Sequence, residues 1–283
     1  MAAIITLTTD FGLADAYVAA MKGVILSINP EAKLIDICHS IRPQNISQAA
    51  FVLSTAYQFF PKRTIHVVVV DPGVGTERRA IILRTPLADF VAPDNGVLSY
   101  VIQQSSSKPI NVNRQQVELA PELEAVAITK PQFWRSPVSS TFHGRDIFAP
   151  VAAQLSLGSP PVDFGETITS LIMIPLSRPY KTAADTLAGH VLHIDNFGNL
   201  ITNIKSDDLP KQTVTIEVGN QLIRGLSHTY EEGRGLLALI GSSGYLEISL
   251  KGGSASAFLN AEAGSEVKIR IGAPHHPTLP HKG

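Results

Sequence analysis

Apolar runs alternate with amphipathic stretches along residues 1–174. The run 64–70 contains four consecutive valines, which is typical of a strand buried on both faces of a parallel sheet. The stretch 15–29 places its apolar residues on one helical stripe and is followed by a proline. This repeated order predicts an α/β domain with a mostly parallel sheet. The other elements predicted here are strands 4–9, 33–38, 80–84, 90–92 and 125–129 and helices at about 46–60, 94–103 and 140–157, the last capped by Ser140 or Thr141.

The pattern changes in the second part of the chain, where only short strands separated by turns are visible. Such strands predict a smaller all-β barrel domain at 188–273. The predicted strands are 190–194, 200–204, 213–218, 222–225, 236–240, 245–250 and 266–271. The segment 175–187 has two prolines and no periodicity, so we interpret it as a linker, and we expect 274–283 to be a flexible tail.

Two carboxylates stand where predicted parallel strands end. Asp10 follows the first strand, and Asp71 follows the valine run, each directly before turn sequence. Ligands of open parallel sheets bind beyond the carboxyl ends of the strands. The positions of Asp10 and Asp71 therefore predict a ligand-binding site at that edge of the sheet. A carboxylate here can accept hydrogen bonds from both hydroxyls of a ribose, and Asp15 stands close behind. The alternative is that Asp10 is a turn residue and Asp15 a charge at a helix start.

The glycine-rich loop that begins at Asp71 lacks the Gly-Lys-Ser/Thr ending of a phosphate loop. Arg78 can fold back to pair with Asp71, although a tight turn with solvated charges is the alternative. His143 is predicted at a helix start, where the neutral imidazole is favoured, or else it is a capping or surface residue. A metal site formed by Asp10, Asp71 and His143 is disfavoured because no metal-ligand spacing is present.

Composition narrows the classes of protein that the chain can be. A formal net charge of −1 argues against a general nucleic-acid binder. The single cysteine, Cys38, excludes an internal disulfide and a cysteine-based zinc cluster, and we expect a buried, unreactive thiol. No run approaches the ~20 apolar residues of a membrane-spanning helix, and no basic region precedes Ile4, so a soluble cytoplasmic protein without membrane partners is expected.

Six stretches together resemble one known family. They are Thr8-Thr-Asp-Phe-Gly12, Asp71-Pro-Gly-Val-Gly75 with Arg78, Ala92-Pro-Asp-Asn-Gly96, Thr141-Phe-His-Gly-Arg-Asp146, Asp195-Asn-Phe-Gly-Asn199 and Gly241-Ser-Ser-Gly-Tyr245. In this order they resemble the S-adenosyl-L-methionine (SAM) hydroxide adenosyltransferases, relatives of the fluorinating and chlorinating SAM enzymes. The resemblance implies an N-terminal α/β domain, a C-terminal β-barrel and a homotrimer with active sites at subunit interfaces.

The resemblance also implies roles for individual residues. Asp71, Arg78 and His143 match the catalytic set, and no metal or cofactor is implied. The substrate-binding positions implied are Asp10 and Asp15 near the ribose, Asp195 and Ser242 at the methionine amino group, Ser243 at its carboxylate, and Phe197, Asn199, Tyr230 and the backbone near Gly252 around adenine. The chain departs from the family at 230–235, which is a shorter loop, and at Lys251, where asparagine is expected.

The resemblance implies hydrolysis of SAM to adenosine and L-methionine, and the chemistry of these residues fits that reaction. A sulfonium is already a good leaving group, so attack by water at C5′ needs positioning and a polar partner for the water but no metal. The first alternative is a SAM:halide adenosyltransferase, which the negative charge of Asp71 disfavours because it repels chloride or fluoride. The second alternative is a SAM- or adenosine-binding module without turnover. The Asp–Arg–His set disfavours it, because binding alone needs no group that activates water.

Overall fold

The computed structural model describes residues 2–107, 115–210, 212–233 and 235–271. The chain divides into two compact units, Met1–Leu176 and Ser177–Gly283, called unit 1 and unit 2 below. Each has its own hydrophobic core. Unit 1 is α/β and unit 2 is antiparallel β, which confirms the predicted fold class.

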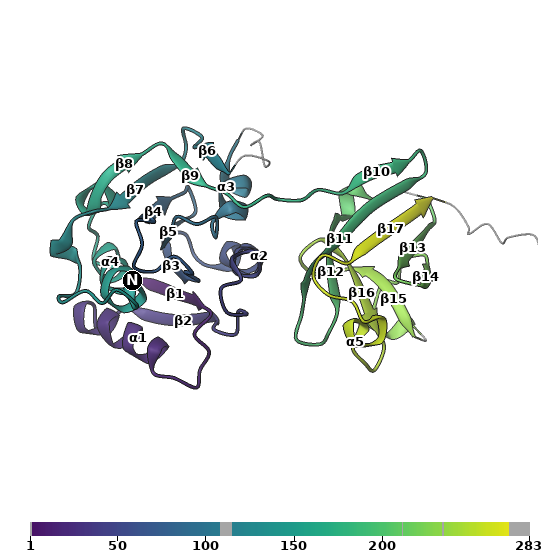
Figure 1. Ribbon diagram of the computed structural model, residues 1–283, viewed down its shortest axis with the longest axis horizontal. Coiled ribbons are helices and arrows are strands. Elements are labelled where there is room, and N and C mark those ends of the chain that lie inside the picture. The colour runs from purple at the N-terminus through teal and green to yellow at the C-terminus, as the bar shows by residue number, and fades with distance from the viewer. Residues whose placement is uncertain (1, 108–114, 211, 234, 272–283) are drawn as a thin grey trace, which may run out of the picture. The chain divides into compact units, whose positions relative to one another are not determined.

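The sheet of unit 1 has seven strands in the order β2-β1-β3-β5-β4-β7-β8 (Figure 1). They are β1 (Ile4–Thr9), β2 (Lys33–Cys38), β3 (Thr64–Val69), β4 (Ala80–Arg84), β5 (Ala88–Pro93), β7 (Glu124–Ile128) and β8 (Gly165–Ile168). Strands β2, β1, β3 and β5 are parallel, and β4, β7 and β8 continue the sheet antiparallel. Two short strands that the sequence pattern does not show, β6 (Gln116–Glu118) and β9 (Ser170–Ile172), pair separately.

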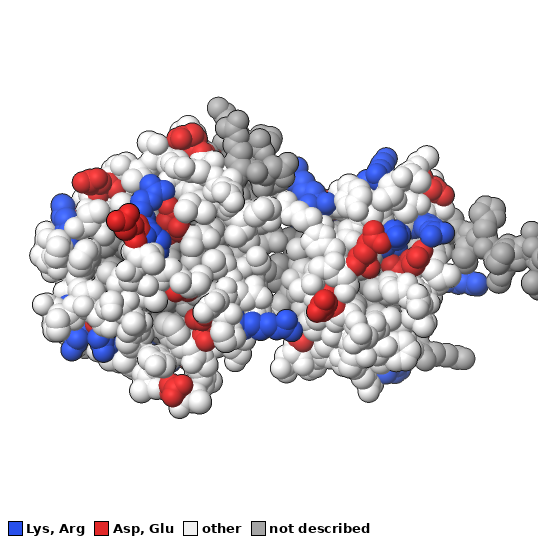
Figure 2. Space-filling model, in the orientation of Figure 1, with Lys and Arg blue, Asp and Glu red and all other residues white. Residues whose placement is uncertain are grey.

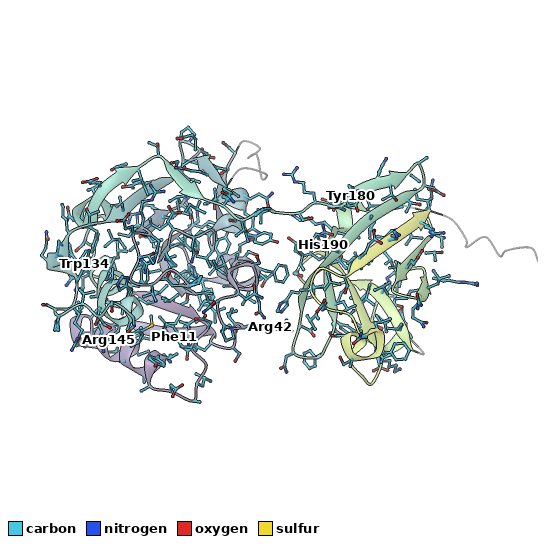
Figure 3. All side chains as sticks on the ribbon, viewed as in Figure 1. Phe11, Arg42, Trp134, Arg145, Tyr180 and His190 are labelled. Carbon is cyan, nitrogen blue, oxygen red and sulfur yellow. The ribbon has the colours of Figure 1, made fainter. Side chains whose placement is uncertain are left out.

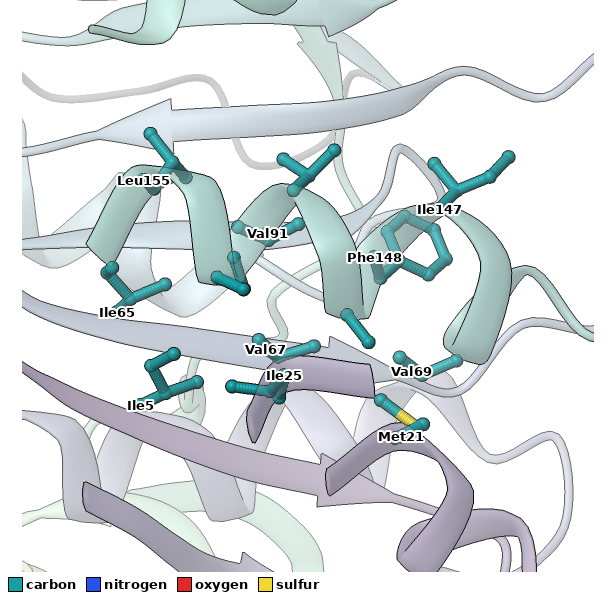
Figure 4. Close-up of a cluster of buried hydrophobic side chains, with 14 of the residues drawn as sticks. Ile5, Met21, Ile25, Ile65, Val67, Val69, Val91, Ile147, Phe148 and Leu155 are labelled. Atoms are coloured by element: carbon teal, nitrogen blue, oxygen red, sulfur yellow. The ribbon is translucent and has the colours of Figure 1, made fainter. Parts of the chain in front are cut away.

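Helices cover both faces of this sheet. Helices α1 (Tyr17–Ile28) and α4 (Ala149–Ser156) pack on each other and on the central strands, and Figure 4 shows Met21, Ile25 and Phe148 in that core. On the other face lie α2 (Ile46–Ala56), which continues into a 3₁₀ turn, and α3 (Ser99–Ser105). The turn after α2 is η1 (Tyr57–Phe59), and the other 3₁₀ turns among the described residues are η2 (Pro131–Phe133), η4 (Pro161–Phe164), η5 (Ser206–Asp208) and η6 (Tyr230–Glu232).

The helix predicted at 140–157 differs from the observed one. It begins as a π-helical turn, η3 (Gly144–Phe148), and continues as α4. The N-cap position belongs to His143 and has no side-chain cap bond, so the prediction of Ser140 or Thr141 as the cap is wrong. Single-turn π segments are frequent at functional sites. The chain therefore brings His143, rather than a capping hydroxyl, to the start of the helix.

Strand β3 is buried along its whole length, as predicted, and carries one titratable side chain in the core. His66 is fully buried, stacks on Phe90 with ring centroids 5.1 Å apart, and its Nδ1 lies 2.7 Å from the Thr6 hydroxyl. Burial lowers the pKa of His66 to about 4. His66 is therefore neutral in the folded protein at neutral pH.

We expect His66 to make the fold acid-sensitive. In the unfolded chain it takes up a proton near pH 6.5, and in the fold only near pH 4, so stability is lost as pH falls between these values. The loss of unfolding free energy through this residue is about 3 kcal/mol. Urea unfolding at pH 7 and pH 4 measures it. His66→Phe should reduce the difference between the two pH values, while the exposed control His228→Gln should not. An unchanged difference in His66→Phe contradicts the assignment.

Unit 2 is an eight-stranded antiparallel sheet that curls into a nearly closed barrel. Its strands are β10 (Tyr180–Ala183), β11 (Thr186–Ile194), β12 (Leu200–Lys205), β13 (Val214–Val218), β14 (Gln221–Arg224), β15 (Leu236–Ile240), β16 (Tyr245–Leu250) and β17 (Glu266–Ile271). Strand β10 and the start of β11 lie within 175–187, the expected linker. All four residues of β10 are exposed, so no apolar alternation marks it. Helix α5 (Ala255–Leu259) was also not predicted.

Three remaining expectations concern the C-terminal tail, the cysteine and membrane-spanning helices. The predicted flexible tail 274–283 lies outside the described residues. Cys38, at the end of β2, is a free thiol, but it is half-buried rather than buried because β2 is an edge strand. None of the helices among the described residues is long and apolar enough to cross a membrane. On the face shown in Figure 2, acidic and basic side chains are intermixed in both units.

Candidate active site

A pocket of about 370 Å³ opens at the carboxyl edge of the sheet in unit 1. It lies where β1 and β3 end, which is the point at which the strand order reverses and where open α/β sheets bind their ligands. Asp10 directly follows β1, and Asp71 stands two positions after the end of β3. Because the parallel strands pair Thr9 with Val69, the two carboxylates reach the same edge of the sheet. A cavity is therefore present at the edge where the sequence predicts a site. The lining residues are Asp10, Phe11, Tyr17, Pro43, Gln44, Val69, Asp71, Pro72, Val74, Thr141, Phe142, His143 and Gly144.

Asp71, Arg78 and His143 form one hydrogen-bonded chain of side chains. The Arg78 Nε donates to both carboxylate oxygens of Asp71 at 2.9 Å, and its Nη2 also donates to Oδ2. The same Nη2 lies 2.9 Å from Nδ1 of His143. The side chains of Asp71 and Arg78 are only 5% and 10% exposed, and the guanidinium lies over the ring of Phe148. Arg78 thus folds back onto Asp71, as predicted.

The neighbours of His143 determine its protonation. Burial lowers the pKa of His143, the positive charge of Arg78 lowers it further, and Asp71 and Asp146 act in the opposite direction. The imidazole is therefore neutral at neutral pH. Because a guanidinium has only donors, Nδ1 of His143 must accept from Arg78, and the single ring proton then resides on Nε2. His143 offers the pocket a hydrogen-bond donor, not a free base.

Two features of the pocket were not found by sequence reasoning. Three aromatic rings, Phe11, Tyr17 and Phe142, contact one another with centroids 5.1 to 5.7 Å apart and wall one side of it. Figure 3 shows Phe11 beside α1. The backbone N–H of Gln44 donates to Oδ2 of Asp10 at 2.8 Å. Phe11 and Phe142 stand in the motifs at 8–12 and 141–146, so their presence in those motifs could have indicated the aromatic wall.

Asp15, predicted to bind substrate near the ribose, is exposed and is not among the lining residues.

In unit 2, three of the predicted residues meet in the turn between β11 and β12. Asp195 Oδ1 accepts from the backbone N–H groups of Phe197 and Asn199, and its Oδ2 accepts from the amide of Asn199, all at 2.9 Å. This turn holds Phe197 outward with 77% of its surface exposed. The carboxylate of Asp195 is thus used first by its own turn, with lone pairs remaining on Oδ2.

The remaining residues predicted in unit 2 lie on neighbouring turns. Ser242 and Ser243 are exposed on the turn between β15 and β16, and Gly252 adopts a left-handed φ of +74° after β16. Lys251, the departure from the family pattern, donates to the carboxylate of Glu231 at 2.8 Å. Within the chain as described, these residues belong to unit 2, and Asp10, Asp71, Arg78 and His143 belong to unit 1.

Glu247 is a buried carboxylate of unit 2 that sequence reasoning missed. Its Oε1 accepts from the Tyr230 hydroxyl at 2.7 Å and from the Ser249 hydroxyl at 3.1 Å. Burial raises the pKa of Tyr230 to about 12, together with Glu247 and the charge of Asp195. Tyr230 is therefore a fixed, protonated ring beside the turn of Asp195. The alternation of β16 gave no signal, because it puts Leu246 and Ile248 in the core and Glu247 with Ser249 on the opposite face, where a solvated carboxylate is the norm.

The fold and the pocket define a class: an α/β protein with a candidate small-molecule pocket at the switch point of its sheet. Family models for the SAM hydroxide adenosyltransferase N-terminal and C-terminal domains match residues 5–165 and 189–268. The chain belongs to the SAM hydroxide adenosyltransferase family.

Named relatives and a solved structure agree with this assignment. The chain is 37% identical to a protein of Methanocaldococcus jannaschii named (R)-S-adenosyl-L-methionine hydrolase, over 94% of this chain and 95% of the relative. It is 33% identical to a protein of the same name from Thermus thermophilus, over 92% and 97%. A Nocardia brasiliensis fluorinase is 26% identical over 95% and 97%. A crystal structure of an uncharacterized Thermotoga maritima protein superposes with a TM-score of 0.83 at 36% identity, over 94% of this chain and 99% of that one.

Proposed function

We propose that this protein hydrolyses SAM to adenosine and L-methionine by attack of water at C5′. The observation that carries the proposal is the hydrogen-bonded chain of Asp71, Arg78 and His143, of which Asp71 and His143 line the switch-point pocket. Relatives at 33% to 37% identity that span nearly the whole chain are named SAM hydrolases. Incubating the purified protein with SAM and separating the products by chromatography tests the proposal, which fails if no adenosine forms.

The reaction forms a C5′–O bond and breaks the C5′–S bond, whose electron pair leaves with the thioether of methionine. The Nε2–H of His143 and the guanidinium of Arg78 orient the attacking water. As the C–O bond forms, the oxygen becomes strongly acidic and must lose a proton. Nδ1 of His143 is occupied by Arg78, so the acceptor within the set is a lone pair of Asp71 that Arg78 leaves open.

The substrate-binding residues follow from the same proposal. Asp10 retains lone pairs beside its bond to Gln44 and takes the ribose hydroxyls. Asp195 and Ser242 meet the amino group, Ser243 the carboxylate, and Phe197 with Tyr230 the adenine ring, together with Asn199 and the backbone at Gly252. The names of the relatives specify the (R) sulfonium, so we propose this epimer as the better substrate, and assays with both epimers compare them.

The halide-using alternative is tested in the same assay. Asp71 is a buried carboxylate within the pocket lining, and an anion of this kind repels chloride and fluoride. Added halide should leave adenosine as the only nucleoside product. A 5′-halogenated nucleoside in the presence of chloride or fluoride would favour the transferase instead.

The protonation of His143 predicts how turnover depends on pH. Its pKa lies below 6.5, so the neutral form, which accepts from Arg78, dominates at and above neutral pH. As pH falls through that pKa, Nδ1 becomes protonated, repels Arg78, and kcat falls. A plot of log kcat against pH should therefore be flat from about pH 7 upward and decline on the acid side. A rise of kcat with acidification would contradict the assigned tautomer.

We also propose a homotrimer in which each active site combines residues of two subunits. The family resemblance supports it, and the residues proposed for catalysis and for adenine lie in different units of the chain. The cytoplasmic location expected from the sequence stays a prediction.

A further inference from the structure

The motif at 92–96 contributes no residue to the proposed hydrolysis. Ala92-Pro-Asp-Asn-Gly96 stands at the end of β5, the parallel neighbour of β3. Asp94 and Asn95 therefore come to the same carboxyl edge as Asp71. Asp94 is 3% exposed, and neither residue lines the pocket. A buried carboxylate must be paired, and its partners show what it fixes.

Asp94 holds the residue that directly follows Arg78. The Arg79 guanidinium donates to Oδ2 of Asp94 through Nε at 2.9 Å, and also through Nη2. The backbone N–H of Ile172 donates to Oδ1 of Asp94 at 2.8 Å, and that of Asp94 donates to the carbonyl of Arg79 at 2.9 Å. Arg79 is thus fixed by both its side chain and its backbone.

Asn95 holds the residue that directly precedes Asp71. Its amide Nδ2 donates to the carbonyl of Val70 at 2.9 Å, and its Oδ1 accepts from the backbone N–H of Val97 at 3.2 Å. The loop 71–78 is therefore anchored at both ends by two consecutive residues of one motif. Between the anchors, Gly75 has a φ of +78° and packs against the backbone of Ser140, so the loop is also seated on the segment that leads to His143.

We propose that Asp94 and Asn95 are positioning residues, which hold the two ends of the loop 71–78 so that Asp71, Arg78 and His143 meet in reacting geometry. This inference rests on the proposed hydrolysis of SAM. Neither residue touches the substrate. Loosening either end lets Arg78 turn away from His143, so turnover is lost while the binding surfaces formed by Asp10 and the aromatic wall remain.

The chain supplies a matched control on the same hairpin. Arg84 and Asp89 form a paired guanidinium and carboxylate, with Nε to Oδ1 at 2.8 Å, across the register pair Arg84–Asp89 of β4 and β5. This pair lies next to the hairpin turn, whereas the Arg79–Asp94 pair lies at the opposite, open end beside the loop. Asp89→Asn weakens the same kind of interaction at the other end of the same hairpin, away from the loop.

The test compares Asp94→Asn, Arg79→Gln, Asn95→Asp and Asp89→Asn in steady-state SAM hydrolysis. Asn95→Asp keeps the acceptor for Val97 and removes the donor to Val70. We expect kcat to fall by about 10- to 100-fold in the first three with KM within about threefold, and to stay within about twofold in Asp89→Asn. Because Arg79 and Asp94 act as one unit, the double variant Asp94→Asn/Arg79→Gln should lose little more than either single variant.

A second measurement separates positioning from general destabilisation. Moving the charge of Arg78 away from His143 should shift the acid limb of the pH profile upward by roughly half a pH unit in Asp94→Asn, and not in Asp89→Asn. If Asp94→Asn does not fold, the partly exposed Arg79→Gln variant carries the comparison. Losses in Arg79→Gln and Asn95→Asp no larger than in Asp89→Asn would overturn the inference. Absence of hydrolysis in the unmodified protein would instead overturn the proposed function.

Discussion

Asp71→Asn is expected to lower kcat for SAM hydrolysis by about 1000-fold while KM changes by less than about threefold. Asparagine has nearly the same shape and still offers an oxygen to Arg78. It removes the negative charge that balances a guanidinium only 10% exposed, and it removes the lone pairs that take the proton of the attacking water. Both losses fall on the transition state, because the bound substrate does not touch a proton acceptor until the C–O bond forms.

Asp10→Ala is the contrasting variant. A carboxylate that accepts from two ribose hydroxyls acts equally in the bound substrate and in the transition state, so KM should rise and kcat should change little. Chromatographic progress curves give both constants, and calorimetric titration with SAM gives binding directly. If Asp71→Asn lost binding while bound SAM was turned over at the normal rate, the two roles would have to be exchanged.

Much of unit 1 was predictable because parallel sheets impose strong constraints on sequence. The buried valine run fixed β3, the motif after β1 fixed Asp10, and both carboxylates had to reach one edge once the strands were parallel. The pairing of Arg78 with Asp71 was also foreseeable, because a buried carboxylate requires a partner. Periodicity carries this information because it is set by burial.

What was missed depends on contacts between segments far apart in the chain. The proton on Nε2 of His143 follows from a guanidinium 65 positions away, and the anchoring role of Asp94 follows from its bonds to Arg79 and Ile172. Glu247 went unnoticed because alternation places it on the polar face of β16, where it would be solvated, and cannot show the Tyr230 hydroxyl that it binds. Strand β10 was missed because an edge strand exposed on both faces has no pattern to detect.

Mixing two inactive variants is expected to restore activity if active sites form between subunits. One parent is Asp71→Ala, which damages unit 1. The other is the double variant Phe197→Ala/Ser242→Ala, which damages unit 2 at two exposed side chains and so leaves its core intact. When the two parents are refolded together in equal amounts, trimers form at random. Some of their sites then join an intact unit 1 of one subunit to an intact unit 2 of its neighbour. About one quarter of all sites are of this kind, so about a quarter of the unmodified activity should return.

The same mixture excludes the competing arrangement without ambiguity. If both units of one chain formed each site, every chain in the mixture would carry one damaged half, and mixing would add nothing to the sum of the two parents. Thermal unfolding of each parent confirms that its loss of activity is not a loss of fold, and each parent refolded alone gives the baseline. Light scattering at the assay concentration gives the oligomeric state, and a fully active monomer would contradict the shared site. The ratio of recovered to parental activity therefore decides whether residues from two subunits meet around one molecule of SAM.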